Sequence, residues 1–386
     1  MADPAPVLRA ADLVVTFAGR KGPVRALNGV NLGLNRGVTF GLVGESGCGK
    51  SVFARALLRL IQRPGRIADR TIGFRPSADG AERNLLHAPE RAMEALRGDR
   101  LAMVFQEPSA ALNPLLRVGD QVAEPFLIHR RAELARVAAE RVPRLFRPLC
   151  RLAAARPESF LLGLLDRLPL LRRWETPLRT EARRRAVQVI DRLGIPDAEA
   201  AARRFPHELS GGMKQRIAIA AALALRPLVL VADEATSNLD VTVQARILDL
   251  LRDLRRTEVA TVLLITHDLG VVAETCERAA VLYAGTVCEV ADVEDLFAHP
   301  RHPYTRALLD AVPPDAPDRM PEAIPGTVPD LANPPPGCPF APRCPNAEAP
   351  CSQRVPPLLP VDDRETTSLG ENSGEHLAAC FFLVEP

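Results

Sequence analysis

The sequence predicts an α/β fold in which a parallel sheet is covered by helices on both faces. Short apolar runs typical of buried strands alternate along the chain with helix-like segments. The run at residues 38–43 leads through a glycine-rich loop directly into a helix-like stretch that starts near Val52. Folds of this class bind ligands at the carboxyl ends of their strands, so we expect the functional site there.

Composition limits the class of protein. The chain has 386 residues, a formal net charge of +2 and 47% hydrophobic residues, which predicts a globular protein of two or three packed units. Its apolar runs are shorter than the ~18–20 residues that a membrane span needs. The amino end lacks the basic start and apolar core of a secretory signal, so we expect a cytoplasmic protein. Its eight cysteines are then thiols rather than disulfides.

The amino-terminal part predicts an antiparallel hairpin. Residues 7–17 and 24–34 both alternate between apolar and polar side chains, and glycines lie between them. Phe17 in the first stretch is suited either to stacking on an adenine ring or to packing in the core.

The loop that follows the hairpin, called the phosphate loop below, consists of Gly44, Glu45, Ser46, Gly47, Cys48, Gly49, Lys50 and Ser51. Glycines allow a backbone to curl so that several N–H groups point at one anion, and a helix start adds its positive dipole end. Lys50 is placed to reach the outer phosphates, and the Ser51 hydroxyl to bind Mg²⁺. The loop therefore predicts a P-loop nucleoside triphosphatase.

Three further strand ends carry polar side chains. The predicted strand 101–105 ends at Gln106, which is suited to holding Mg²⁺ or the attacking water, or only to bonding a loop. The run 228–232 ends at Asp233, suited to Mg²⁺ through water, and Glu234, suited to polarising a nucleophilic water. The strand 259–265 precedes His267, whose imidazole would meet the γ-phosphate.

A second glycine-rich helix start precedes the acidic strand. It comprises Leu209, Ser210, Gly211, Gly212, Met213, Lys214 and Gln215, and it leads into an alanine-rich helix at 217–225. Backbone N–H groups at such a helix start predict another anion site. Farther on, Asp240 opens a helix predicted from Val241 to about Arg256.

An arginine-rich segment lies between these motifs. Residues 130–185 contain 15 arginines and six acidic residues, with leucines between the arginines. Such a surface suits anionic lipid headgroups, or equally a solvated helical face. Prolines divide the segment into short pieces.

The carboxy-terminal part begins with a predicted hairpin at 279–290. Residues 300–360 hold 18 of the 36 prolines, which excludes long helices and strands. Cys338, Cys344, Cys351 and Cys380 lie in this loop-rich tail and suit an iron–sulfur cluster or Zn²⁺. The absence of C-x2-C knuckles favours iron and sulfur, and four merely buried cysteines are the remaining alternative. We interpret the remaining cysteines as packing residues: Cys48, Cys150, Cys276 and Cys288.

Taken together, these motifs resemble the ATP-binding subunits of ABC transporters over nearly the full chain. The resemblance implies Walker A roles for Lys50 and Ser51, and it implies a role for each of the other motif residues: Gln106 as the Q-loop, 209–215 as the signature, Asp233 as Walker B, Glu234 as the catalytic glutamate, Asp240 as the D-loop, His267 as the switch histidine and Phe17 as the adenine-stacking aromatic. Residues 233–240 read D-E-A-T-S-N-L-D where the family usually has D-E-P-T-T-A-L-D, so the D-loop is altered.

Four segments resemble the oligopeptide/dipeptide importer branch more narrowly: 105–114, 239–245, 302–305 and 337–344. In that branch the cysteine tail is associated with a [4Fe-4S] cluster, so the resemblance implies this cluster on the four tail cysteines and leaves Zn²⁺ as the alternative. The implied domains are an ATPase at 1–298 and a proline-rich extension at 299–386. Within the ATPase we expect a helical subdomain at about 107–208, lengthened by the arginine-rich insertion at about 136–180.

The resemblance also implies a function and partners. We expect ATP hydrolysis that powers peptide uptake, with ATP and Mg²⁺ bound by the chain. The alternatives are an importer of another solute, such as a metal ion or a glutathione-like or opine-like compound, and a non-transport ABC ATPase. The expected partners are a second ABC ATPase in a head-to-tail heterodimer, two transmembrane permeases and an extracellular or periplasmic solute-binding protein, without nucleic acid. The chain would then lie at the cytoplasmic face of the cell membrane.

Overall fold

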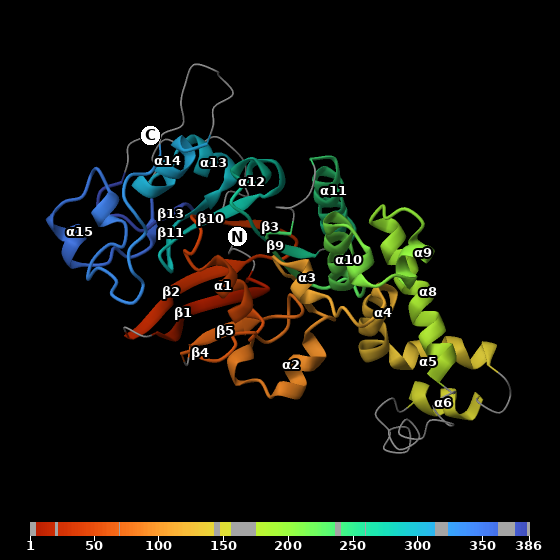
Figure 1. Ribbon diagram of the computed structural model, residues 1–386. Coiled ribbons are helices and arrows are strands. Elements are labelled where there is room, and N and C mark those ends of the chain that lie inside the picture. Colours follow the sequence, from red (N-terminus) through yellow and green to blue (C-terminus); the bar gives the residue numbers. More distant parts are fainter. Residues whose placement is uncertain are drawn as a thin grey trace. The chain divides into compact units, whose positions relative to one another are not determined.

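The computed structural model describes residues 5–19, 22–68, 70–142, 147–155, 175–235, 241–258, 260–312, 323–361 and 375–383. The chain divides into two compact units. The first contains residues 1–93, 231–234 and 254–386, and the second contains 94–230 and 235–253 (Figure 1). Within the described ranges no helix is both long and apolar enough to cross a membrane.

An antiparallel sheet forms one part of the first unit. Its strands are β1 (Leu8–Gly19), β2 (Gly22–Leu34), β4 (Gly65–Ile67), β5 (Thr71–Phe74) and β6 (Arg83–Asn84). The order is β2-β1-β5-β6, with β4 also paired to β1. Strands β1 and β2 pair from Leu8 opposite Leu34 to Gly19 opposite Gly22, which confirms the predicted hairpin. Alternate residues such as Leu13 and Val15 are fully buried, as period-two patterning requires.

A second sheet of the first unit is mostly parallel at its centre. Its strands are β3 (Thr39–Val43), β8 (Val229–Asp233), β9 (Thr261–Ile265), β10 (Arg278–Tyr283), β11 (Thr286–Asp292), β12 (Leu359–Pro360) and β13 (Leu377–Ala378), in the order β12-β13-β11-β10-β3-β9-β8. Strand β3 runs parallel to both β10 and β9. Every residue of β3, β8 and β9 is buried, which explains apolar runs without alternation. The predicted α/β fold is confirmed.

Helices and short turns complete the first unit. They are α1 (Lys50–Leu57), η1 (Leu85–His87), the first part of α2 (Glu90–Leu96), α12 (Leu269–Thr275), α13 (Val293–Ala298), α14 (Pro303–Asp310), η4 (Ala341–Arg343) and α15 (Ala349–Gln353). Strands β10 and β11 form the predicted closing hairpin. The described elements beyond residue 300 are short, as the prolines predicted. Three aromatic rings, those of Tyr283, Tyr304 and Phe340, pack together at centroid distances of 4.5–5.3 Å and tie this segment to β10.

The second unit is helical apart from one short strand. It contains β7 (Leu101–Val104), α3 (Pro108–Ala111), α4 (Val118–His129), α5 (Arg131–Arg141), α6 (Arg147–Ala155), α8 (Thr176–Arg192), α9 (Ala198–Arg203), η3 (Pro206–Glu208), α10 (Gly211–Leu223) and most of α11 (Val241–Glu258). Buried side chains of α4, α5 and α8, including Val122, Leu134 and Ile190, form its core. Strand β7 ends at Val104, one residue earlier than predicted.

The arginine-rich segment is described in part, as α5, α6 and the start of α8. Residues 143–146 and 156–174, which carry most of its leucines, lie outside the described ranges. Several of its arginines pair with carboxylates, such as Arg131 with Glu175 at 2.9 Å. Glu181 on α8 is 4% exposed and accepts hydrogen bonds from Arg141, Arg184 and Arg185. These pairs show that part of the positive charge of this segment is neutralised within the second unit.

We predict that Glu181→Gln destabilises the protein by roughly 1–3 kcal/mol at pH 7, because it removes a charged acceptor from three arginines. Hydrogen bonds from Arg184 and Arg185 lower the pKa of Glu181 to about 2. Its contribution is therefore complete above the unfolded-state pKa and declines as the pH falls from about 4.5 towards 2. Urea unfolding of the wild type and the variant at pH 7 and pH 3 measures the difference between their free energies of unfolding. An equal difference at both pH values would contradict the prediction.

Candidate functional site

The phosphate loop curls tightly between β3 and α1, and two of its three glycines are required by the space available to a side chain as well as by their φ angles. Gly44 has φ +147°, and a Cβ atom there would lie 2.1 Å from the carbonyl oxygen of Leu282. Gly49 has φ +109°, and its Cβ would lie 2.6 Å from the carbonyl oxygen of Ala26. Only glycine allows this approach. Ser46 and Gly47 at the tip remain exposed, so the concave backbone stays accessible to an anion.

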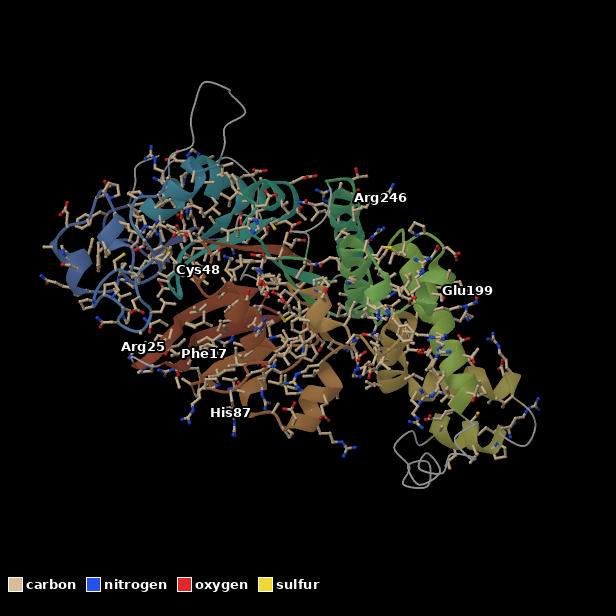
Figure 2. All side chains as sticks on the ribbon, viewed as in Figure 1. Phe17, Arg25, Cys48, His87, Glu199 and Arg246 are labelled. Carbon is tan, nitrogen blue, oxygen red and sulfur yellow. The ribbon has the colours of Figure 1, made fainter. Side chains whose placement is uncertain are left out.

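Lys50 begins α1 and is 6% exposed. Its Nζ donates hydrogen bonds to the carbonyl oxygens of Gly44 at 2.6 Å and Glu45 at 3.0 Å. The ammonium group therefore stays within the loop, next to the positive end of the α1 dipole. A buried ammonium group beside a helix start is suited to a phosphate group, so the geometry is compatible with the sequence-based prediction. Figure 2 labels Cys48 in this loop; its thiol is fully buried.

Ser51 and Asp233 form the next part of the site. The Ser51 hydroxyl donates to Oδ1 of Asp233 at 3.0 Å. Asp233 is 1% exposed, and burial raises the pKa of its carboxyl group. Its other oxygen, Oδ2, is buried and has no hydrogen-bond partner. A hydroxyl and a carboxylate with an unsatisfied oxygen are the ligand types that Mg²⁺ prefers, so these residues fit that ion.

Glu234 and His267 lie at the carboxyl ends of the adjacent strands β8 and β9. Glu234 has φ +47°, a left-handed conformation that is uncommon for a side-chain-bearing residue. Its backbone N–H donates to the carbonyl oxygen of Ile265 at 2.9 Å. His267 Nδ1 lies 3.4 Å from Glu234 Oε1, and the histidine side chain is 61% exposed. A carboxylate and an imidazole held in this way are able to orient and deprotonate a water molecule.

The second glycine-rich helix start lies in the second unit. Ser210 is the N-cap of α10, and its Oγ accepts the Met213 backbone N–H at 3.3 Å. Gln215 is buried and donates to the carbonyl oxygen of Ala235 at 2.6 Å. Ser210 and Gly211 are exposed, so this helix start is open to an anion from outside the unit. Helix α10 begins at Gly211, earlier than the predicted 217–225, because the glycines belong to its first turn.

The other three predicted site residues are Gln106, Phe17 and Asp240. Gln106 is exposed and follows the end of β7 by two residues. Phe17 lies on β1, half-buried beside Gly65 and opposite Val24 (Figure 2). Asp240 lies outside the described ranges. Their proposed roles stay predictions.

The four tail cysteines line one cavity together with side chains that include His302 and Phe340. The cavity volume is about 10 Å³, close to what one water molecule needs. Burial raises the pKa of the Cys380 thiol to about 11. Among the described residues, no three histidine, cysteine or acidic side chains form a group ready to hold a metal ion. Four thiols fit iron–sulfur or zinc ligation in donor type.

Sequence reasoning missed two residues that contact the phosphate loop. The Glu45 backbone N–H donates to the Tyr304 hydroxyl at 2.9 Å, and the Glu45 carboxylate pairs with Arg343. These partners lie more than 250 residues farther along the chain, so local patterns carry no sign of them. The four remaining cysteines, Cys48, Cys150, Cys276 and Cys288, are all buried, which confirms their reading as packing residues.

A comparison with family models matches residues 27–237 to the ABC transporter family, and residues 288–351 to the carboxy-terminal region of oligopeptide/dipeptide transporters. The chain belongs to the ABC transporter family. The ABC match spans the phosphate loop, the signature and the β8 carboxylates, and the second match includes three of the four tail cysteines. The site is therefore that of an ABC ATPase.

Several relatives of this ABC protein are named as ATP-binding proteins of peptide transport. This chain is 42% identical to a probable peptide ABC transporter ATP-binding protein of Sinorhizobium fredii, over 92% of each chain. It is 37% identical to the dipeptide transport ATP-binding protein DppD of Bacillus subtilis, over 96% of each chain. It is 39% identical to the oligopeptide transport ATP-binding protein OppD of Salmonella typhimurium, over 98% of this chain and 94% of that one.

Among solved structures, the dimeric bacterial ABC transporter cassette MJ0796 is similar in fold. The TM-score is 0.55 at 24% identity, over 74% of this chain and 98% of the cassette. A second structure of that cassette, in a post-hydrolysis state with ADP and phosphate, gives a TM-score of 0.54. At this identity the likeness confirms the cassette fold.

We predict that Lys50→Ala lowers the affinity for ATP about tenfold to a hundredfold, because it removes a buried ammonium group worth roughly 1.5–3 kcal/mol to a charged partner. Lys50→Gln keeps hydrogen-bond donors in the loop but removes the charge, and we expect it to lose most of the affinity as well. Calorimetric titration of the purified chain with ATP measures both. Wild-type affinity in the alanine variant, with an unchanged melting temperature, would contradict this role.

Proposed function

We propose that this chain is the ATP-hydrolysing subunit of a membrane importer for dipeptides or oligopeptides. The observation that carries the proposal is the presence, on one chain, of an ABC ATPase and the carboxy-terminal region of oligopeptide/dipeptide transporters. Relatives of nearly the same length are named for dipeptide and oligopeptide transport. The partners would be two permeases, a second ABC ATPase and a solute-binding protein outside the membrane, with this chain at the cytoplasmic face.

The geometry of the phosphate loop and of the β8 and β9 strand ends supports roles for five of the site residues, and the sequence motifs alone support those of Gln106 and Phe17. Lys50 and the backbone of the phosphate loop bind the β- and γ-phosphates, and Ser51 with Asp233 holds Mg²⁺. When bound, Mg²⁺ supplies positive charge that offsets the negative charge of the phosphates. Glu234 takes a proton from the attacking water, while His267, 3.4 Å from that carboxylate, orients the water and the γ-phosphate. Gln106 senses the γ-phosphate, and Phe17 stacks on the adenine.

The exposed start of α10 would complete the site of a partner. Ser210, Gly211 and Gly212 present N–H groups and a positive dipole end at an exposed helix start. In a head-to-tail dimer, this signature segment closes on the ATP held by the second ATPase. Closure of the dimer on two ATP molecules, and its reopening after hydrolysis, would then drive the permeases.

The test is transport by the reconstituted complex. Liposomes with the permeases and both ATPases should take up dipeptides or oligopeptides, and hydrolyse ATP faster, when the loaded solute-binding protein is added. Stimulation by another class of solute, such as a metal ion or glutathione, and not by peptides, would contradict peptide import.

We predict that Glu234→Gln in this complex slows ATP hydrolysis by about 10²–10⁴-fold and leaves ATP binding intact, because the amide cannot accept a proton. Peptide uptake should stop with it. Glu94→Gln, an exposed change of the same chemistry on α2, is the matched control and should keep the wild-type rate. An unchanged hydrolysis rate in Glu234→Gln would exclude this carboxylate as the base.

The proposal includes a [4Fe-4S] cluster on Cys338, Cys344, Cys351 and Cys380. What supports it is that four thiols separated by up to 42 positions in the sequence line a single cavity. Ligation by four thiolates would pin a tail of short elements, including η4 and α15, that has few long-range strands of its own. The role is structural in this proposal, with Zn²⁺ as the alternative ion.

We predict that the chain purified without oxygen is brown and contains about four iron and four sulfide per chain, because a cubane cluster with four thiolate ligands has this composition. Cys351→Ser should lower both, whereas Cys150→Ser, a buried thiol of the second unit, should not. Elemental analysis and the visible absorption spectrum measure this. Zinc without iron would show that Zn²⁺, and not the cluster, occupies the site. If no metal is bound, the four cysteines are packing residues.

A further inference from the structure

A bidentate ion pair joins the phosphate loop to the carboxy-terminal tail. Arg343 Nη1 lies 2.6 Å from Glu45 Oε2, and Arg343 Nη2 lies 3.1 Å from Glu45 Oε1. The two residues are 298 positions apart in the sequence. Two parallel N–H···O bonds between a guanidinium and a carboxylate fix direction as well as distance, so this contact constrains how the loop lies.

The Arg343 side chain is also fixed by contacts other than the one with Glu45. Its side chain is 4% exposed, and its Nε donates to the carbonyl oxygen of Pro325 at 2.7 Å. Further bonds run from Nη2 to the carbonyl oxygen of Ile324 and from Nη1 to the Tyr283 hydroxyl, both at 3.2 Å. The guanidinium also lies 5.8 Å from the Tyr283 ring centroid. Of these partners only Glu45 is an anion, so breaking the pair leaves a buried charge uncompensated.

Glu45 is also anchored through its backbone. Its N–H donates to the Tyr304 hydroxyl at 2.9 Å, and Tyr304 is fully buried among the aromatic rings of Tyr283 and Phe340. Its carbonyl oxygen accepts the hydrogen bond from Lys50 Nζ at 3.0 Å. The contacts therefore run without a gap from Arg343 through Glu45 to the lysine of the phosphate site.

We propose that Arg343 is a positioning residue for ATP binding, through which the cysteine-bearing tail braces the phosphate loop. Arg343 directly precedes Cys344 and is the last residue of η4, so the brace belongs to the segment that lines the cysteine cavity. It acts in two ways. It fixes the conformation of Glu45, and it neutralises a carboxylate that would otherwise repel the phosphates of ATP.

The inference rests on ATP binding by the loop, and a double-mutant cycle on the full chain tests it separately. Arg343→Ala should weaken ATP binding on the order of tenfold, because Glu45 is then both mobile and unpaired. Glu45→Ala removes the repelling carboxylate, so the double variant should bind ATP more tightly than Arg343→Ala alone. If Arg343 were purely structural, the double variant should instead bind ATP more weakly than Arg343→Ala, because the second substitution would add its own loss of affinity.

Two further variants sharpen the result. Arg354→Ala removes an exposed arginine of the same tail that lies 5.6 Å from the Phe381 ring, and it should leave ATP affinity unchanged. Arg343→Lys keeps the positive charge but loses the bidentate hydrogen bonds of the guanidinium, so its ATP affinity should lie between those of the wild type and Arg343→Ala. It replaces Arg343→Ala in the double-mutant cycle if the alanine variant does not fold. In the complex, Arg343→Ala should raise KM for ATP with kcat within about threefold, since Arg343 touches no reacting atom.

Calorimetry with ATP is the primary readout, and the melting temperature is recorded for each variant. Wild-type affinity in Arg343→Ala, or a double variant weaker than both single variants, would overturn the proposal. The wild-type chain and Lys50→Ala serve as references. If the wild type itself fails to bind ATP, the proposed function fails rather than the brace.

Discussion

The phosphate loop lies so close to its neighbouring strands that side chains are excluded at two of its positions. A Cβ atom at Gly44 or Gly49 would come within 2.6 Å of a carbonyl oxygen of β10 or β2. This approach sets the curl of the loop, which in turn places Lys50 at the start of α1 and brings Ser51 to Asp233 on β8. The site therefore depends on backbone packing between strands that are far apart in sequence, more than on any one charged group.

Two carboxylates of this unit, Asp233 and Glu45, lie in different electrostatic surroundings. Asp233 is buried with one oxygen unpaired, which costs free energy unless a cation satisfies it. Glu45, by contrast, lies on a loop built for anions and has its own cation in Arg343. One carboxylate is left for a ligand and the other is neutralised by the protein. Asp233 is thus suited to binding a ligand, whereas Arg343 acts on Glu45 to position the loop.

The tail that follows residue 300 has a role in the fold that its composition alone would not suggest. Its elements are short, yet it supplies Tyr304, Phe340 and Arg343 to the surroundings of β10 and the phosphate loop. The cysteine cavity lies next to these residues, with Phe340 and His302 in its lining. Cross-linking such a tail by a metal would limit its conformational freedom, and the contacts to Glu45 would carry that order to the loop.

The sequence by itself determined the α/β class, the β1–β2 and β10–β11 hairpins and the motif at each strand end, because these follow from local periodicity and from residue types whose chemistry is specific. It also indicated the family through the order of those motifs. Only the tertiary structure decided that Glu234 sits beside His267 in a left-handed conformation, that Asp233 has an unpaired oxygen, and that Arg343 meets Glu45. The physical reason is that long-range pairing depends on how strands order themselves in a sheet, and a local pattern does not encode that order.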